Sequence, residues 1–189
     1  YAFPPHVRWT IAEEDAGGYL AAADFINGQD FDVVCLQHEF GIFGGEAGNL
    51  VLDLIAALRV PLVTTLHTVL DRPTDAQRTV IEAILAASAR VVVMAQKGRR
   101  ILIDCYGATP DKILVIPHGI PDVPLVLPQS AKEALGFADR RVILTFGLIS
   151  PNKGIETMIE AMPAVLAQAP DAVYVVMGAT HPVLLREEG

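Results

Sequence analysis

The stretch VILTFGLISPNKGIETMIEAM, residues 142–162, holds a strand, a turn and the start of a helix in direct succession. The run VILTF is typical of a buried strand, and from Ile155 onward apolar side chains recur at helical spacing. The turn between them ends in Lys153 and Gly154. The start of a helix carries partial positive charge and free N–H groups, so a lysine there is disfavoured unless a negative group lies nearby. The stretch therefore predicts an α/β unit with Lys153 at a helix start, where the positive charge of the lysine requires an explanation.

The same alternation of strands and helices runs through the rest of the chain. Strands that alternate with helices form parallel sheets with right-handed crossovers, so we predict a Rossmann-like, doubly wound α/β fold. The expected strands are 7–11, 32–37, 60–68, 90–94, 112–116, 142–146 and 172–177, and the expected helices are 18–26, 50–58, 75–87, a segment ending near Tyr106, and one that starts at Gly154.

A change in amino-acid composition at residues 117–140 predicts a boundary between domains. Prolines 117, 121, 124 and 128 crowd this segment, and neither a central strand nor a helix tolerates them. We interpret 117–140 as an interdomain linker, 1–116 as an incomplete N-terminal Rossmann-like domain, and 141–189 as the opening βαβ unit of a second one.

Composition and charge exclude several classes of protein. The chain has 189 residues, 52% of them hydrophobic, so it buries a core and is not disordered. Its formal net charge of -8 argues against a protein that coats nucleic acid. Asp32, Asp53 and Arg59 interrupt the richest apolar stretches, which leaves no membrane-spanning window. Contact with a membrane surface remains open.

Cysteine and histidine spacing predicts neither a disulfide nor a metal site. Cys35 and Cys105 stand far apart without a CxxC pattern, which favours reduced thiols in a cytoplasmic protein. His38 and Glu39 do not extend to HExxH because position 42 is Ile42. We therefore expect no metal ligands.

Doubly wound sheets bind ligands outside the carboxyl ends of their strands, and this rule selects the candidate site residues. Lys153 suits an anion whose charge would offset both the lysine and the helix dipole, while Gly154 lets a ligand approach the backbone closely. The alternative is a lysine in water beside a helix capped by Ser150 or Asn152. The turn is not a phosphate-binding P-loop, because GxxxxGK[ST] is absent.

Further candidates lie in the loop after the strand at 32–37 and at the end of the strand at 60–68. The loop GIFGGEAG, residues 41–48, admits a sugar or phosphate near a helix start, or simply forms a tight turn. His67 is placed to bond a hydroxyl or a phosphate oxygen, or else is a buried histidine bonded to the backbone. The residues alone leave both pairs of alternatives open.

Several of these segments together resemble a known family. ILVIPHGI at 113–120, the turn at 147–154, LQHEFGIFGG at 36–45 and TLHT at 65–68 resemble retaining GT-B glycosyltransferases of the group 1, family 4 type. In that family the turn commonly reads G-R-x-x-x-x-K-G. The resemblance implies transfer of a sugar from a nucleotide-sugar to an acceptor hydroxyl, with retention at the anomeric carbon and without a cofactor or an essential metal.

The resemblance also assigns roles to the candidates. It implies that Lys153 stabilises the departing diphosphate, with Gly147 and Gly154 on the donor side, and that His67 lies by the transferred sugar at the reaction centre. Our acceptor-side candidates are Glu39, Gly44 and Gly45. The partners to expect are a nucleoside-diphosphate sugar and a carbohydrate or lipid-linked acceptor.

Departures from the family pattern keep two other functions open. Leu148 stands where the family has the arginine that shares the diphosphate, and the family's E-x7-E motif is not in this sequence. We therefore expect a longer protein, and no activity from this stretch alone. The alternatives are a non-catalytic sugar- or nucleotide-binding regulator with a degenerate GT-B fold, and a nucleotide-sugar 2-epimerase that would use Glu39 and Glu46 as acid and base.

Overall fold

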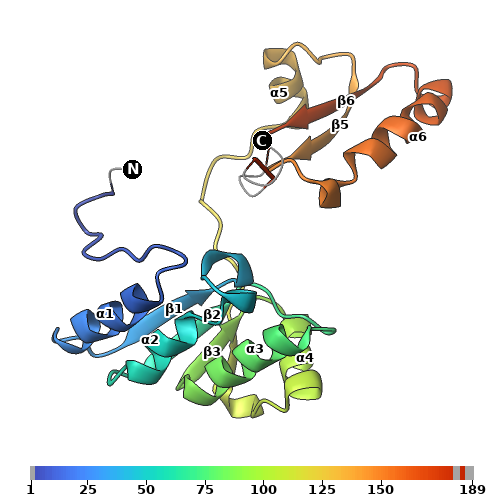
Figure 1. The fold of residues 1–189 in the computed structure, drawn as a ribbon. Coiled ribbons are helices and arrows are strands. Elements are labelled where there is room, and N and C mark those ends of the chain that lie inside the picture. The colour runs from blue at the N-terminus through green and yellow to red at the C-terminus, as the bar shows by residue number, and fades with distance from the viewer. Residues whose placement is uncertain (1–2, 181–183, 186–189) are drawn as a thin grey trace. The chain divides into compact units, whose positions relative to one another are not determined.

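The computed structural model describes residues 3–180 and 184–185. The chain folds as two compact units, Tyr1–Ile120 and Pro121–Gly189 (Figure 1). No helix within the described residues is long and apolar enough to cross a membrane.

The first unit is built on a parallel sheet. Its strands lie in space in chain order, so that strands consecutive in the sequence are paired in parallel. In this register Val34 lies opposite Leu62 and Thr64 lies opposite Val91. The strands are β1 (Val34–His38), β2 (Leu62–Leu66), β3 (Arg90–Val93) and β4 (Ile113–Val115).

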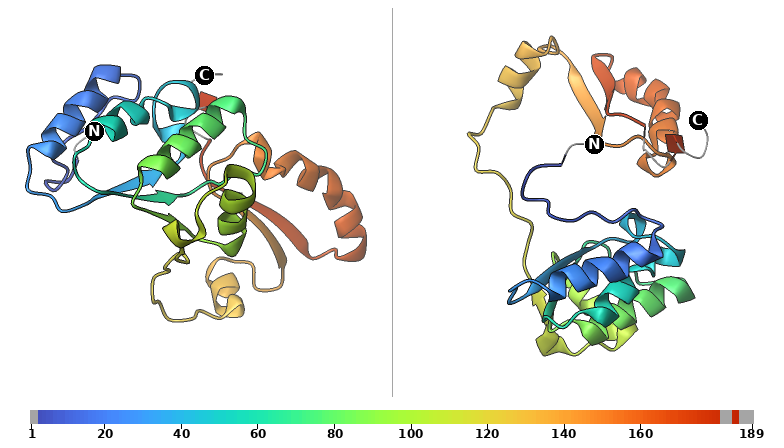
Figure 2. Two further views of the ribbon diagram at one scale, coloured as in Figure 1. Left: turned by 90° about the horizontal axis from the view of Figure 1, so that it is seen from below. Right: turned by 60° about the vertical axis from the view of Figure 1, so that its left-hand side comes forward.

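Helices cover one face of this sheet. Because the strands succeed one another in one direction, right-handed crossovers bring all the connecting helices to the same side. Figures 1 and 2 show α1, α2 and α3 side by side on that face, and α1 contacts α2 as α2 contacts α3. The helices are α1 (Ala16–Asn27), α2 (Val51–Ala57), α3 (Asp75–Ala87) and α4 (Gln96–Tyr106).

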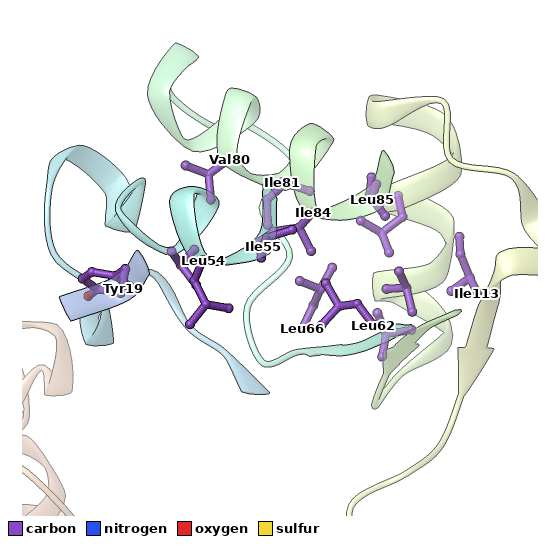
Figure 3. Close-up of a cluster of buried hydrophobic side chains, with 14 of the residues drawn as sticks. Tyr19, Leu54, Ile55, Leu62, Leu66, Val80, Ile81, Ile84, Leu85 and Ile113 are labelled. Atoms are coloured by element: carbon purple, nitrogen blue, oxygen red, sulfur yellow. The ribbon is translucent and has the colours of Figure 1, made fainter. Parts of the chain in front are cut away.

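The core lies between these helices and the sheet. Figure 3 shows Ile81 and Ile84 of α3 close to Leu62 and Leu66 of β2, and all of these side chains are buried. Because side chains alternate across a strand, the other face of the sheet carries the opposite set, including the exposed Cys35 of β1.

Local sequence signals fix where helices begin and end. Thr74 caps α3: its hydroxyl accepts a hydrogen bond from the backbone N–H of Gln77, whose side chain accepts one from the N–H of Thr74. At the end of α4, Gly107 has φ +64°, a left-handed conformation that glycine adopts without strain. The predicted bounds of α3 agree with the structure residue for residue.

The second unit pairs β5 (Arg141–Phe146) with β6 (Ala172–Met177) in parallel, joined by α6 (Ile155–Gln168). A further short helix, α5 (Pro128–Ala134), lies in the proline-rich segment. Our expectation that this segment holds no helix is wrong. Pro128 occupies the first turn of α5, where a backbone N–H would have no helical partner in any case, so the proline fits there.

The strand expected at 7–11 is absent from the described residues, which assign no strand before β1. Trp9 stacks on Phe25 of α1 with ring centroids 5.0 Å apart, and Ile11 packs against the core. The alternating apolar side chains of this segment therefore cover a helix and do not extend the sheet.

Candidate functional site

Two histidines stand at the carboxyl ends of β1 and β2 in very different surroundings. His38 is completely buried, and neither of its ring nitrogens has a hydrogen-bond partner among the described residues. Its ring meets Phe40 edge-on and stacks on Phe43, with centroids 5.1 and 5.8 Å away. Burial lowers the pKa of His38 to about 4; Glu39 opposes the shift and His67 adds to it.

Glu39 joins the loop after β1 to the segment after β2. Its Oε1 accepts a hydrogen bond from the backbone N–H of Phe40 at 2.9 Å, and its Oε2 accepts one from the Thr68 hydroxyl at 2.6 Å. Both carboxylate oxygens are therefore engaged in holding the loop.

His67 is exposed, and its ring bonds a side chain. The Nε2 atom lies 2.9 Å from Oε1 of Gln37, and the ring centroid lies 6.0 Å from that of His118. The alternative of a buried histidine bonded to the backbone is therefore wrong for the ring. The backbone N–H of His67, and not its ring, bonds the main chain of the described residues, donating to the carbonyl of His38 at 3.0 Å.

A cavity of about 290 Å³ opens beside His67 within the first unit. It lies at the ends of β2 and β3 next to the start of α4, and its charged lining residues are Asp71 and Lys97. This is the position in which sheets of this kind bind ligands.

The glycines of the loop after β1 allow close contacts with other parts of the chain. A Cβ on Gly44 would lie 1.9 Å from the carbonyl oxygen of Glu13, and the backbone N–H of Gly44 donates to the Tyr19 hydroxyl at 2.9 Å. Gly45 has φ +78°, and its N–H donates to the Glu14 carboxylate at 3.2 Å. These contacts favour the tight-turn interpretation, and the acceptor-side role of Glu39, Gly44 and Gly45 stays a prediction.

In the second unit, Lys153 lies at the start of α6 in the turn Pro151–Lys153. Helix α6 begins at Ile155, directly after Gly154, which has φ +62°, and no side chain caps the helix. Ser150 precedes the 3-10 turn Pro151–Lys153 with Pro151 in its first position, as the alternative expected, but the side chains of Ser150 and Asn152 contact each other and neither caps α6. The first N–H groups of the helix therefore lack a side-chain acceptor of the capping type.

The Lys153 side chain folds back over the end of β5. Its Nζ lies 3.7 Å from the position that a Cβ on Gly147 would take, and Gly147 has φ +118°. A Cβ on Gly178, just after β6, would lie 1.8 Å from the carbonyl oxygen of Gly147. The two glycines thus let the strand ends approach closely beneath the ammonium group.

Leu148, which follows Gly147, is 46% exposed and supplies no charge to this turn. The turn therefore offers one cation and the free N–H groups of α6, a combination that can hold an anion.

The structure gathers the predicted residues into two groups. Gly147, Lys153 and Gly154 meet in the second unit. Glu39, His67 and the glycines of the loop share one edge of the sheet in the first. Sequence analysis missed Gln37 as the partner of His67, although alternation along β1 and β2 puts both side chains on the same face. Within the described residues no cluster of three potential metal ligands occurs.

Sequence comparison relates the chain to a family of transferases. The profile of Glycosyltransferase Family 4 matches residues 4–122. The chain is 30% identical over 184 residues to a D-inositol 3-phosphate glycosyltransferase of Kineococcus radiotolerans, covering 85% of this chain and 41% of that protein. It is 33% identical over 155 residues to the enzyme of the same name from Geodermatophilus obscurus, covering 74% and 33%. The chain thus spans less than half the length of these relatives.

Structural comparison gives the fold. HepE of Anabaena in complex with UDP superposes with a TM-score of 0.65 at 19% identity, covering 90% of this chain and 45% of that one. The same protein in complex with UDP-glucose gives a TM-score of 0.61 at 20% identity, covering 91% and 46%. The predicted α/β fold of GT-B type is confirmed.

Proposed function

The chain belongs to glycosyltransferase family 4, and from this membership we propose that the full-length protein transfers a sugar from a nucleotide-sugar to an acceptor hydroxyl. The observation that carries the proposal is the position of Lys153, whose ammonium group lies over Gly147 at the uncapped start of α6. We further propose that the anomeric configuration is retained.

The chemistry follows from the charge that develops during transfer. When the bond between the sugar and the nucleotide breaks, negative charge builds on the departing diphosphate. A preorganised cation and backbone N–H groups lower the energy of that state most when water is excluded. Lys153 and the start of α6 supply both kinds of group in one turn. In this proposal no bound metal or other cofactor is needed.

The remaining roles are assigned by position. In the proposal His67 contacts the transferred sugar, and the loop that holds Glu39, Gly44 and Gly45 faces a carbohydrate or lipid-linked acceptor. UDP-glucose is the first donor to test, because UDP and UDP-glucose occupy the structurally similar HepE. We place the reaction in the cytoplasm, where a lipid acceptor would bring the protein to the inner membrane face.

Leu148 favours a second candidate, a nucleotide-binding regulator without catalysis. Its exposed aliphatic side chain lies where the family's arginine would share the diphosphate charge, so this turn offers less stabilisation to a leaving group. A regulator would bind nucleotide-sugar without consuming it, and a transferase would release the nucleotide. The 2-epimerase alternative would need Glu39 and Glu46 for proton transfer, and the bonds of both Glu39 oxygens suit a loop-holding role better.

Calorimetric titration of the full-length protein with UDP and with GDP tests the proposal. We expect one nucleotide to bind, and Lys153→Ala to weaken that binding by about 1.5–3 kcal/mol, as for a hydrogen bond to a charged group. Lys132→Ala is the matched control, because Lys132 lies in α5 and its side chain makes no hydrogen bond among the described residues. Failure of properly folded protein to bind either nucleotide would contradict the proposal.

A further inference from the structure

The pairing of β1 with β2 brings Gln37, Thr65 and His67 together on one face of the sheet. Gln37 lies directly opposite Thr65 in the parallel register, and His67 follows two residues after Thr65 on the same side. The hydrogen bond from the backbone N–H of His67 to the carbonyl of His38, 3.0 Å, extends the ladder past the end of β2. The backbone positions of all three residues are therefore fixed by the sheet.

Their side chains form a short hydrogen-bond chain. The Gln37 amide nitrogen donates to the Thr65 hydroxyl at 3.4 Å, which turns the amide oxygen toward His67. That oxygen lies 2.9 Å from Nε2 of His67. A carboxamide oxygen only accepts hydrogen bonds, so Nε2 must carry the proton.

The other ring nitrogen is left available. Nδ1 of His67 has no hydrogen-bond partner among the described residues, and His67 is one of the residues that line the cavity beside α4. In the neutral ring a protonated Nε2 makes Nδ1 an acceptor, which suits a hydroxyl group of a ligand.

We propose that Gln37 is a positioning residue: it holds the His67 imidazole as the Nε2–H tautomer and so presents Nδ1 as a hydrogen-bond acceptor. The proposal rests on the proposed function only for the identity of the hydroxyl that Nδ1 meets, which would belong to a sugar. Thr65 supports the same arrangement by fixing the orientation of the Gln37 amide.

The test is to measure the tautomer of His67 by NMR in the full-length protein labelled with ¹⁵N-histidine. Spectra are recorded at about pH 8, where an ordinary histidine is neutral, and the His67 signals are identified by their loss in His67→Phe. We expect Nε2–H in the wild type. Gln37→Leu should shift the tautomer ratio about five-fold toward Nδ1–H, the effect of losing one hydrogen bond.

Several variants distinguish the loss of His67 positioning from a general disruption of the fold. Gln37→Glu keeps an accepting oxygen and should retain the wild-type tautomer. Thr65→Val releases the amide to turn over and should shift the ratio in the direction of Gln37→Leu. Gln29→Leu makes the same chemical change at an exposed glutamine whose side chain has no hydrogen bond in the described part of the chain, and should change nothing. An equal ratio in wild type, Gln37→Leu and Thr65→Val overturns the proposal.

Activity supplies a second readout. With a transferable donor, Gln37→Leu should lower the transfer rate and Gln37→Glu should restore most of it, while the thermal stability of both stays at the level of Gln29→Leu. The tautomer ratio decides the proposal without any substrate. Absence of nucleotide binding in the wild type would count against the proposed function alone.

Discussion

A histidine whose two ring nitrogens bond nothing is costly to charge inside a core. Within the part of the chain that the structure describes, His38 is such a residue, and Phe40 and Phe43 lie against its ring. Its pKa is lowered to about 4 from 6.5, so between pH 6.5 and pH 4 the imidazole is protonated in the unfolded chain and neutral in the folded one. Stability therefore falls as the pH drops through this window.

We predict a loss of about 2 kcal/mol from His38 between pH 7 and pH 5. Denaturant unfolding at a series of pH values measures it, with the fluorescence of Trp9, the sole tryptophan in the sequence, as the probe. His38→Phe removes the titrating group and should flatten the pH dependence by that amount. Equal slopes in the variant and the wild type would show that His38 is not the cause.

The sequence could not reveal this property of His38. Alternation along β1 separates two faces, but which face is buried depends on where the helices pack. The same limit hid the contact between Gln37 and His67, which lie thirty positions apart and meet only through the register of β1 on β2. The sequence selects Lys153 as a candidate because its conflict with the start of a helix lies within a single turn, and its role stays a prediction.

At the scale of elements, the loop between β1 and α2 is held against the segment before α1 by contacts among Glu13, Tyr19 and Gly44. The hydroxyl of Tyr19 donates to the Glu13 carbonyl and accepts from the N–H of Gly44, both at 2.9 Å. That carbonyl fills the place of a Cβ on Gly44. The segment before α1 and the loop are therefore locked together through the main chain.

Gly44→Ala should destabilise the protein by more than about 2 kcal/mol, since the added methyl group meets backbone that cannot move aside. Gly41→Ala in the same loop is the matched control: nothing lies within 4 Å of its Cβ position, so we expect a change within about 0.5 kcal/mol. Thermal unfolding compares the two variants, and equal shifts in Tm would contradict the prediction.

Local patterns predicted most elements because each carries its own signals. The capping box at Thr74 and the apolar spacing that follows fix α3. The segment at 7–11 has the alternation of a strand, yet Trp9 finds an aromatic partner on α1 and the segment makes no ladder. The sequence does not predict helix α5, because prolines usually break helices, although the first turn of a helix accepts one.

At the scale of the whole molecule, the segment 117–127, which joins the two units, is an expected site of proteolysis. Residues 117–127 form no helix or strand, and their large apolar side chains are exposed, with Leu125 at 89%. Exposed backbone without regular hydrogen bonds is where proteases cut first.

We predict that thermolysin, which cuts before large apolar residues, first cleaves the native protein within 123–127. Trypsin is the control: residues 113–131 contain neither lysine nor arginine, so it should leave this segment intact. Mass spectrometry of the earliest fragments locates the cuts. An earliest thermolysin cut inside α1–α4 would contradict the prediction.

The contact between Gly147 and Gly178 restricts how this protein can be engineered. The obstacle to a side chain at Gly178 is the carbonyl oxygen of Gly147, and every amino acid carries such an oxygen. No second substitution at position 147 can make room, so compensating pairs do not exist for this contact. A mutant library aimed at the proposed donor side should hold position 178 as glycine and vary Leu148, whose side chain is half exposed.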